Sequence, residues 1–207
     1  MTVLPAEATS SGPVPRVTRL LERRGGRVAV EIDGEPWRTL PVDAAVRAEL
    51  RIGVELDRPR LRLVRQELRR AEALAWAVRA LRRRDLSVRG LDQRLEQAGL
   101  RGAERRAALD TLEQAGLLDD ERFAVARAES LAHRGYGDEA IRWLLERDGV
   151  DPDLAGRVVE ALPAERERAT ALAVRRGRGR GTAAFLARRG FAEDSVESAL
   201  GGAGGDE

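Results

Sequence analysis

The six residues Leu-Glu-Gln-Ala-Gly-Leu occur twice in this chain, at 95–100 and again at 112–117. Looser copies follow at 145–150 and 186–191, and all four share a leucine, three further residues, a glycine and an apolar residue. Glycine just past a helix end adopts the left-handed conformation that a side chain resists, and the next residue packs back onto the last helical turn. The repeated motif therefore predicts four helix ends with apolar contacts between Leu95 and Leu100, Leu112 and Leu117, Leu145 and Val150, and Leu186 and Phe191.

The predicted helix starts agree with these ends. In a hydrophobic staple, an apolar residue before the N-cap pairs with one in the second turn, and caps at Ser87, Asp119 and Gly137 give such pairs. Asp151 precedes a proline at the first helical position, where the missing N–H has no cost. The short helices are expected at 87–98, 103–115, 119–134, 137–148, 152–162, 164–176, 181–189 and 193–200.

The helices are expected to form three tandem units of three helices, starting near residues 72, 119 and 163. The cap glycines Gly99, Gly149 and Gly190 are 50 and 41 residues apart. Repeats of this length usually stack, so that each buries the apolar face of its neighbour. The sequence therefore predicts a mainly α fold built from tandem three-helix repeats.

The region before the repeats has a different pattern. Apolar and polar residues alternate around Asp33-Gly34, a strong hairpin motif, so we expect a β meander at 17–42 and a short helix at 43–50. Apolar residues then recur at helical spacing, which predicts one long helix at 58–84, or two helices that meet near Arg70. The expected organisation is a disordered tail at 1–15, a small β-rich N-terminal module at 16–56, the long helix and first repeat at 57–118, the second repeat at 119–162, the third at 163–200 and a flexible tail at 201–207.

Composition excludes several classes of protein. The chain has no cysteine, which rules out disulfides and thiolate metal sites and fits a reducing compartment. No run approaches the roughly 18 apolar residues of a membrane span, and the start of the sequence is unlike a signal peptide, so a cytoplasmic protein is expected.

The charge is unevenly distributed along the chain. The net charge is +3 over 1–78, +5 over 79–106, −8 over 107–165, +7 over 166–191 and −5 over 192–207. Such blocks influence the choice of a macromolecular partner, although charged runs also simply solvate helix faces.

No catalytic constellation is visible in the sequence. The single histidine, His133, is expected at the surface near a helix end. Asp119, Asp120 and Glu121 suggest a magnesium site, but an N-cap and favourable charge at a helix N-terminus explain them sufficiently. The Arg-Gly-Arg-Gly-Arg-Gly run at 176–181 lacks the Lys-Ser/Thr of a P-loop. Two interpretations remain: a flexible arginine loop that binds phosphates or an acidic protein surface, and a solvated linker between helices. Two helical tryptophans, Trp76 and Trp143, are expected in the core.

The stretch Ala-Gly-Leu-Leu-Asp-Asp-Glu-Arg-Phe-Ala at 115–124 resembles the most specific motif of the RecX family, the bacterial regulators of the RecA recombinase. The resemblance extends over about 17–200 and is strongest at 85–160. It departs from the family after Gly137, where many members have proline and an Arg-Ile pair and this chain has Asp138-Glu139-Ala140-Ile141. The motif positions with an expected structural role are Gly99, Gly116, Leu118, Asp119, Asp120, Phe123, Ala124, Gly137 and Gly149.

The resemblance implies an elongated, curved body that docks in the groove of a RecA filament on single-stranded DNA. It implies a monomeric, non-enzymatic regulator without cofactors that restrains recombination, ATP hydrolysis and coprotease action, and so acts on DNA repair and the SOS response. The alternative is a free-standing helical DNA-binding protein, and direct DNA contact is also considered for the RecA regulator. The candidate partner-binding residues are Arg82, Arg83, Arg84, Arg89, Arg94, Arg175, Arg176, Arg178, Arg180, Arg188 and Arg189.

Overall fold

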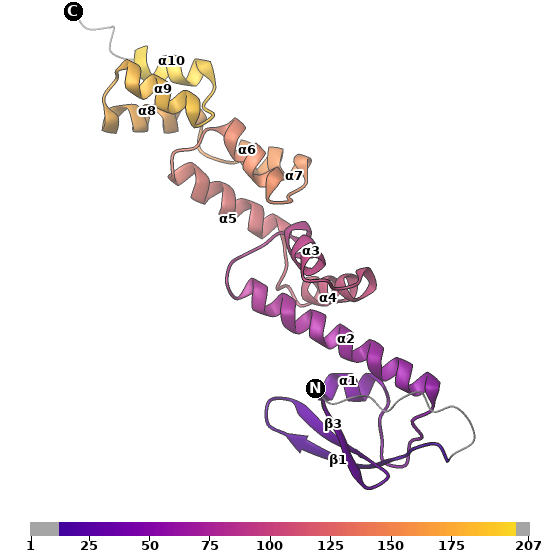
Figure 1. Cartoon of the computed structure of the whole chain (residues 1–207). Coiled ribbons are helices and arrows are strands. Elements are labelled where there is room, and N and C mark those ends of the chain that lie inside the picture. Colours follow the sequence, from indigo (N-terminus) through magenta and orange to yellow (C-terminus); the bar gives the residue numbers. More distant parts are fainter. Residues whose placement is uncertain (1–12, 202–207) are drawn as a thin grey trace, which may run out of the picture. The chain divides into compact units, whose positions relative to one another are not determined.

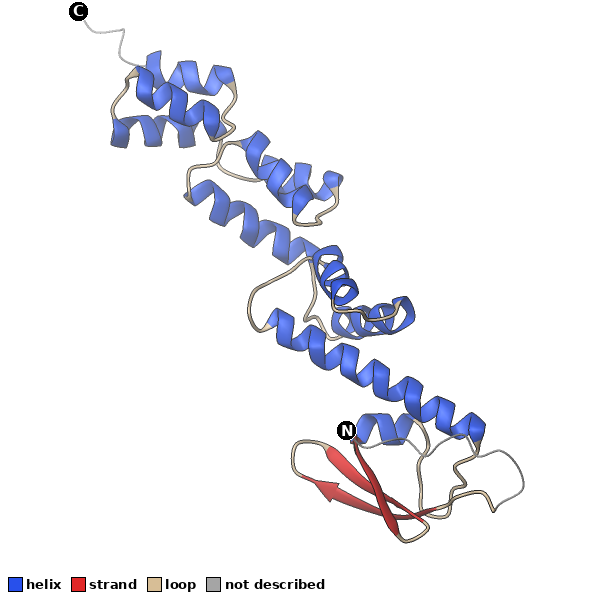
Figure 2. Ribbon diagram, viewed as in Figure 1, coloured by secondary structure: helices blue, strands red, loops and turns tan. Residues whose placement is uncertain are grey.

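The computed structural model describes residues 13–201, so residues 1–12 and 202–207, which hold most of the two expected tails, lie outside the described residues. The described chain is mainly helical and begins with a small antiparallel sheet (Figures 1 and 2), which confirms the predicted fold class. The elements are β1 (Val17–Arg23), β2 (Arg27–Ile32), β3 (Glu35–Pro41), α1 (Val42–Arg47), α2 (Arg58–Leu81), α3 (Val88–Gln97), α4 (Gly102–Gln114), α5 (Asp120–His133), α6 (Asp138–Arg147), α7 (Pro152–Glu160), α8 (Glu165–Arg176), α9 (Arg180–Arg188) and α10 (Glu193–Gly201).

The chain divides into two compact units, Met1–Ala75 and Trp76–Glu207. The division falls inside α2, which is one continuous helix rather than two that meet near Arg70. The helix ends at Leu81, three residues before the predicted end, so Arg82, Arg83 and Arg84 lie in the turn that follows it.

The first unit is built on the β1-β2-β3 meander, with antiparallel pairing throughout. Asp33 and Gly34 both have positive φ, +50° and +86°, as the predicted two-residue hairpin requires. Along β2 the buried residues alternate, at Val28 and Val30, and α1 and the start of α2 pack against this face of the sheet. The core consists of Val17, Val28, Val30, Leu40, Ala45, Ala48, Leu50, Leu56 and Val64.

The repeated motif ends four helices of the second unit. Gly99, Gly116, Gly149 and Gly190 have φ between +66° and +95°. In each motif the amide after the glycine donates to the carbonyl oxygen of the leucine, at 2.9 to 3.2 Å, which is the Schellman hydrogen bond. The prediction of helix ends is confirmed, but Leu117 remains 58% exposed, and its neighbour Leu118 is buried instead.

A fifth copy of the same motif ends α5. Residues 131–136 have the leucine, the glycine and an aromatic residue at the same spacing, Gly135 has φ +77°, and the Tyr136 amide donates to the Leu131 carbonyl oxygen at 3.2 Å. The α5 end is therefore closed in the same way as the end of α9, whose motif also has an aromatic sixth residue, Phe191.

The helices of the second unit form repeats, and repeats 2 and 3 each have a core of their own. Repeat 1 is the end of α2 with α3 and α4, repeat 2 is α5 to α7, and repeat 3 is α8 to α10. The second core contains Ala124, Ala128, Leu131, Ile141, Leu145, Val150, Ala155, Val158 and Val159. The third contains Ala169, Ala173, Leu186, Phe191 and Ala199.

Trp143 does not lie in a core, contrary to expectation, since 58% of it is exposed. The inward positions of α6 are occupied by Ile141, Leu144 and Leu145. Trp143 is two residues beyond Ile141, which places it on the opposite face of the helix. Trp76 is half-buried.

Candidate partner-binding surface

Two contacts connect the three repeats, and each forms where the second helix of one repeat meets the next repeat. We call the contact between repeats 1 and 2 joint 1, formed by Ser87, Val88, Gly90, Asp120, Asp148 and Gly149. We call the contact between repeats 2 and 3 joint 2, formed by Tyr136, Gly137, Asp138, Glu165, Arg168, Arg189, Gly190 and Ala192. The two joints determine how the charged surfaces of the repeats follow one another.

Joint 1 is centred on the hydroxyl of Ser87, the fully buried N-cap of α3. The hydroxyl accepts from the Gly90 amide at 2.9 Å and donates to the Asp148 carbonyl oxygen at 2.6 Å, so it both caps α3 and binds the end of α6. The carboxylate of Asp120, the first residue of α5, accepts the next amide, that of Val88, at 2.7 Å. Repeat 2 therefore supplies two acceptors, the Asp148 carbonyl oxygen and the Asp120 carboxylate, to the N-terminus of α3 in repeat 1.

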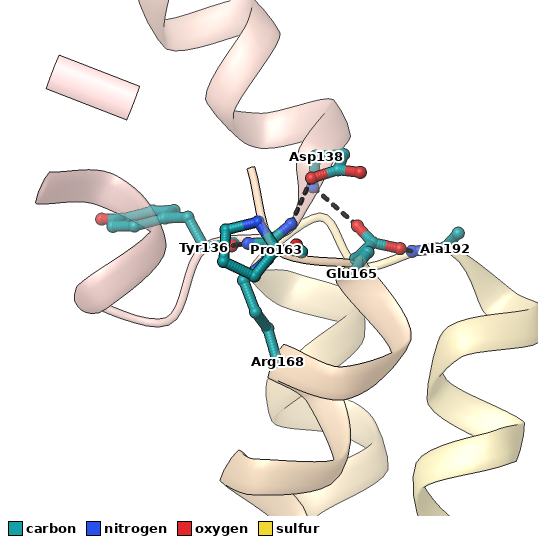
Figure 3. A network of polar contacts seen from close by, with 6 residues as sticks. All are labelled: Tyr136, Asp138, Pro163, Glu165, Arg168 and Ala192. Carbon is teal, nitrogen blue, oxygen red and sulfur yellow. Dashed lines mark hydrogen bonds and ion pairs between the residues drawn. The ribbon is translucent and has the colours of Figure 1, made fainter. Parts of the chain in front are cut away.

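Joint 2 places a carboxylate between two helix N-termini (Figure 3). Glu165, the first residue of α8, accepts the Asp138 amide at 2.6 Å and the Ala192 amide at 3.0 Å. Arg168 forms an ion pair with the Asp138 carboxylate and donates to the Tyr136 carbonyl oxygen at 2.8 Å. The joint thus links α6 with the starts of α8 and α10.

The backbones in joint 2 are in direct contact. The Gly137 amide donates to the Arg189 carbonyl oxygen at 2.8 Å. A Cβ atom on Gly137 would lie 2.1 Å from the Gly190 carbonyl oxygen, so no larger residue fits unless the backbone moves. This close approach explains why glycine stands at this motif position.

The acidic groups of both joints are partly desolvated. Burial raises the pKa of Asp120 above its ordinary value, and the nearby Asp119 charge adds to the rise, whereas the hydrogen bond from Val88 opposes it. Burial also raises the pKa of Asp138, where the Arg168 charge opposes the rise and the Glu165 charge adds to it. In both joints, burial of a carboxylate is therefore only partly offset by its partner.

The repeats carry alternating net charge. Residues 76–118 contain nine arginines and six acidic residues, a net charge of +3. Residues 119–162 contain six and eleven, a net charge of −5, and residues 163–201 contain eight and five, a net charge of +3. Two basic repeats therefore flank an acidic one.

The first group of candidate arginines lies around the start of α3. Arg82, Arg83 and Arg84 are exposed in the turn after α2, Arg89 is exposed in the first turn of α3, and Arg94 is half-buried in its last turn. Among the described residues, none of these five side chains forms a hydrogen bond or an ion pair, and the four exposed ones present their charges to solvent.

The second group lies in repeat 3. Arg175, Arg178, Arg180 and Arg188 are exposed at the end of α8, in the linker and on α9. The guanidinium of Arg176 lies 4.0 Å from the Phe185 ring centroid. Arg189 differs from the rest: it is half-buried, stacks on Tyr136 at 4.4 Å and donates to the Arg134 carbonyl oxygen at 3.2 Å, within the fold.

The motif residues at the start of α5 have separate roles. Asp119 is the N-cap and accepts from the Arg122 amide at 2.9 Å, as expected. Asp120 instead binds across joint 1, a role that sequence reasoning missed. The remaining motif residues lie in a core, at a helix end or in a joint, namely Leu118, Phe123, Ala124, Gly99, Gly116, Gly137 and Gly149.

Other features suggested by the sequence have local explanations. His133 is exposed at the last position of α5, where its Nδ1 lies 3.0 Å from the Glu129 carbonyl oxygen. Among residues 13–201 no group of three or more His, Cys, Asp or Glu residues is placed to hold a metal ion. Within the same residues no helix combines the length and apolar character of a membrane span.

Comparison with known proteins points to one family. A family profile described as RecX, second three-helix domain, matches residues 119–158. The regulatory protein RecX of Thermus thermophilus is 40% identical over 125 residues, which cover 58% of this chain and 84% of that protein. The RecX of Acidithiobacillus ferrooxidans is 32% identical over 137 residues, covering 64% and 91%.

Two solved structures share the fold. The crystal structure of a regulatory protein RecX matches with a TM-score of 0.77 over 89% of this chain and 98% of that chain, at 19% identity. The crystal structure of RecX from Lactobacillus salivarius matches with a TM-score of 0.56 over 64% and 95%, at 14% identity. At these identities the likeness shows the fold.

Proposed function

This chain belongs to the RecX family of regulatory proteins, and from that membership we propose that it binds the RecA recombinase. The form bound is the RecA filament on single-stranded DNA, and binding restrains its ATPase, recombinase and coprotease activities. The chain acts as a monomer in the cytoplasm by occupying a surface, without catalysis and without a cofactor. The naming of the relatives as regulatory proteins supports this non-enzymatic role.

The observation that carries the proposal is the charge order of the repeats, +3, −5 and +3. An extended partner surface with complementary charges determines which repeat binds at which position, because in any other alignment like charges face one another and repel. The joints support this mode of binding, because hydrogen bonds at the helix ends hold neighbouring repeats against one another. Affinity should fall as salt rises, since exposed charges are screened.

The direct test is the DNA-dependent ATPase of RecA on single-stranded DNA, titrated with this protein. We expect progressive inhibition at low salt and weaker inhibition at high salt. A pull-down with RecA, with and without DNA and nucleotide, identifies the bound form. An unchanged ATPase at saturating protein would overturn the proposal.

The arginines after α2 allow a sharper test. Changing Arg82, Arg83 and Arg84 together to glutamate reverses three exposed charges that have no partner among the described residues. We expect at least tenfold weaker inhibition, with an unchanged helical circular dichroism spectrum. The matched control changes three exposed arginines of the β meander, Arg23, Arg24 and Arg38, to glutamate. Equal losses in both variants would show a general charge effect rather than a contact.

A second candidate function is direct DNA binding by repeat 3. Its support is the cluster of exposed arginines at the end of α8 and on α9, next to the Arg176–Phe185 stack. Phosphate contacts of this kind give steeply salt-dependent affinity. A shift assay with DNA alone decides: tight, salt-sensitive binding without RecA favours this function.

A further inference from the structure

An exposed tryptophan on the acidic repeat lies outside the core of that repeat. Trp143 lies on α6, 58% exposed, whereas the core of repeat 2 is filled by other residues of that helix. A single exposed apolar side chain on a surface needs no partner. Trp143 differs from that ordinary case in two respects, its ordering and its surroundings.

The first respect is the ordering of the indole. Arg147, one turn further along α6, places its guanidinium carbon 4.9 Å from the centre of the Trp143 ring, in a cation–π contact. A side chain already held in one orientation loses less conformational freedom when a partner binds. Tryptophan and arginine are also the residue types most enriched among those that dominate protein–protein binding energy.

The second respect is the charge around the indole. Glu139 and Glu146 lie four residues before and three residues after Trp143, so both share its face of the helix. Both are exposed, and among the described residues neither carboxylate forms a hydrogen bond or ion pair. The repeat as a whole has a net charge of −5. These carboxylates repel a phosphate backbone, so the surroundings favour a protein over a nucleic acid.

We propose that Trp143, ordered by Arg147, is the anchor with which repeat 2 binds a protein surface that has an apolar recess bordered by basic side chains. The inference rests on the proposed function, because the protein that carries this recess is a subunit of the RecA filament. The indole enters the recess, and Glu139 and Glu146 pair with the basic side chains at its rim. The basic repeats on either side contact other parts of the filament.

The test is the concentration of this protein that half-inhibits RecA ATPase on single-stranded DNA. Changing Trp143 to alanine is expected to raise it at least tenfold, and changing it to phenylalanine to raise it less, because part of the apolar contact remains. Arg147→Ala should raise it a few-fold, because the indole loses its ordering contact. The matched control is Val174→Ala, at a position 66% exposed on α8, which should change it less than twofold. Thermal unfolding of every variant should match the wild type, since no core contact is removed.

Two results overturn the anchor. One is that the wild-type protein inhibits RecA and the Trp143→Ala variant inhibits it equally well. The other is a Trp143→Ala variant whose binding to naked single-stranded DNA weakens as much as its binding to the filament, because the indole would then stack on bases. A wild-type protein without effect on RecA overturns the proposed function instead, and with it RecA as the occupant.

Discussion

In joint 1 the N-cap residue binds the neighbouring repeat through its side chain, whereas in joint 2 the N-cap residue binds it through the main chain. At the N-cap of α3, the Ser87 hydroxyl donates to the Asp148 carbonyl oxygen at the end of α6. At the N-cap of α6, Gly137 has no side chain, and its own amide donates to the Arg189 carbonyl oxygen at the end of α9. Among the described residues, a backbone–backbone hydrogen bond therefore joins the equivalent helix ends only in joint 2.

The carboxylates of the two joints differ in the number of amides that they bind. Asp120 accepts one amide, from Val88, and Glu165, with its longer side chain, accepts two, from Asp138 and Ala192. Each is the first residue of the first helix of its repeat. Since the first amides of a helix have no partner within it, an acidic residue at this position attaches one repeat to the previous one.

Joint 2 also depends on the residue after Gly137, the position at which this chain departs from the motif that it resembles. A proline at this position would have no amide to donate. Asp138 at that position donates to Glu165 and also pairs with Arg168. Joint 2 therefore has more polar contacts than joint 1 and less space, and we expect both differences to determine its stability.

The largest effect is expected from Gly137→Ala. The new Cβ would meet the Gly190 carbonyl oxygen, a backbone atom that cannot rotate away, so the joint must open and lose the Gly137–Arg189 hydrogen bond. We expect a loss of about 3 kcal/mol or more in the free energy of unfolding, measured with urea. The control is Gly156→Ala in α7, where the added Cβ meets no atom within 4 Å and stability should rise by up to about 1 kcal/mol. Wild-type stability in Gly137→Ala would show that the close contact is not required.

The next largest effect is expected from removal of the joint carboxylates. Glu165→Ala leaves two amides without their acceptor and should cost about 2–3 kcal/mol, and Asp120→Ala leaves one and should cost about half as much. Urea unfolding measures both, and amide hydrogen exchange at Val88, Asp138 and Ala192 locates the loss. Equal costs in the two variants would mean that the number of amides does not decide the strength of a joint.

Sequence reasoning located the helices because their ends depend on local chemistry. The glycines of the repeated motif and the caps at Ser87, Asp119 and Asp151 act within a few residues, and the observed boundaries agree closely with the predicted ones. The joints were not predicted, because Ser87 and Asp148 are 61 residues apart. Local chemistry explains Asp120 only as favourable charge at a helix N-terminus, and its hydrogen bond to Val88 spans 32 residues.

The candidate surface could be predicted only in part, for a similar reason. Composition identified exposed arginines such as Arg82 and Arg178, but nothing local distinguishes them from Arg189, which stacks on Tyr136. Trp143 is expected in a core because it lies within an amphipathic helix, and this expectation is wrong. The helical spacing of Ile141, Leu144 and Leu145 places these three residues on one face of α6. Trp143 is two residues from both Ile141 and Leu145, so the same spacing places it on the opposite face, outside the core.

A smaller effect separates the two roles of Ser87. Ser87→Ala removes an N-cap, worth about 1 kcal/mol, together with the hydrogen bond to Asp148. Asp151→Ala removes an N-cap of α7 whose side chain binds only the amides of its own helix. We expect Ser87→Ala to cost about 0.5–1 kcal/mol more than Asp151→Ala in thermal unfolding. If the two costs are equal, the hydrogen bond from Ser87 to Asp148 adds no stability beyond the capping of α3.

The smallest effect is the pH dependence of joint 1. The pKa of Asp120 is raised in the folded protein by burial and by the Asp119 charge, so its contribution favours folding below pH 3.8 and is lost as pH rises through the folded pKa. Asp120→Asn keeps an oxygen acceptor for the Val88 amide and carries no charge, so the variant should be at least as stable as the wild type at pH 7. The difference should vanish below pH 3.8, whereas Asp110→Asn, an exposed change outside both joints, should show no such trend. Urea unfolding across this range decides, and a variant that is less stable at pH 7 would show that the charge on Asp120 strengthens joint 1.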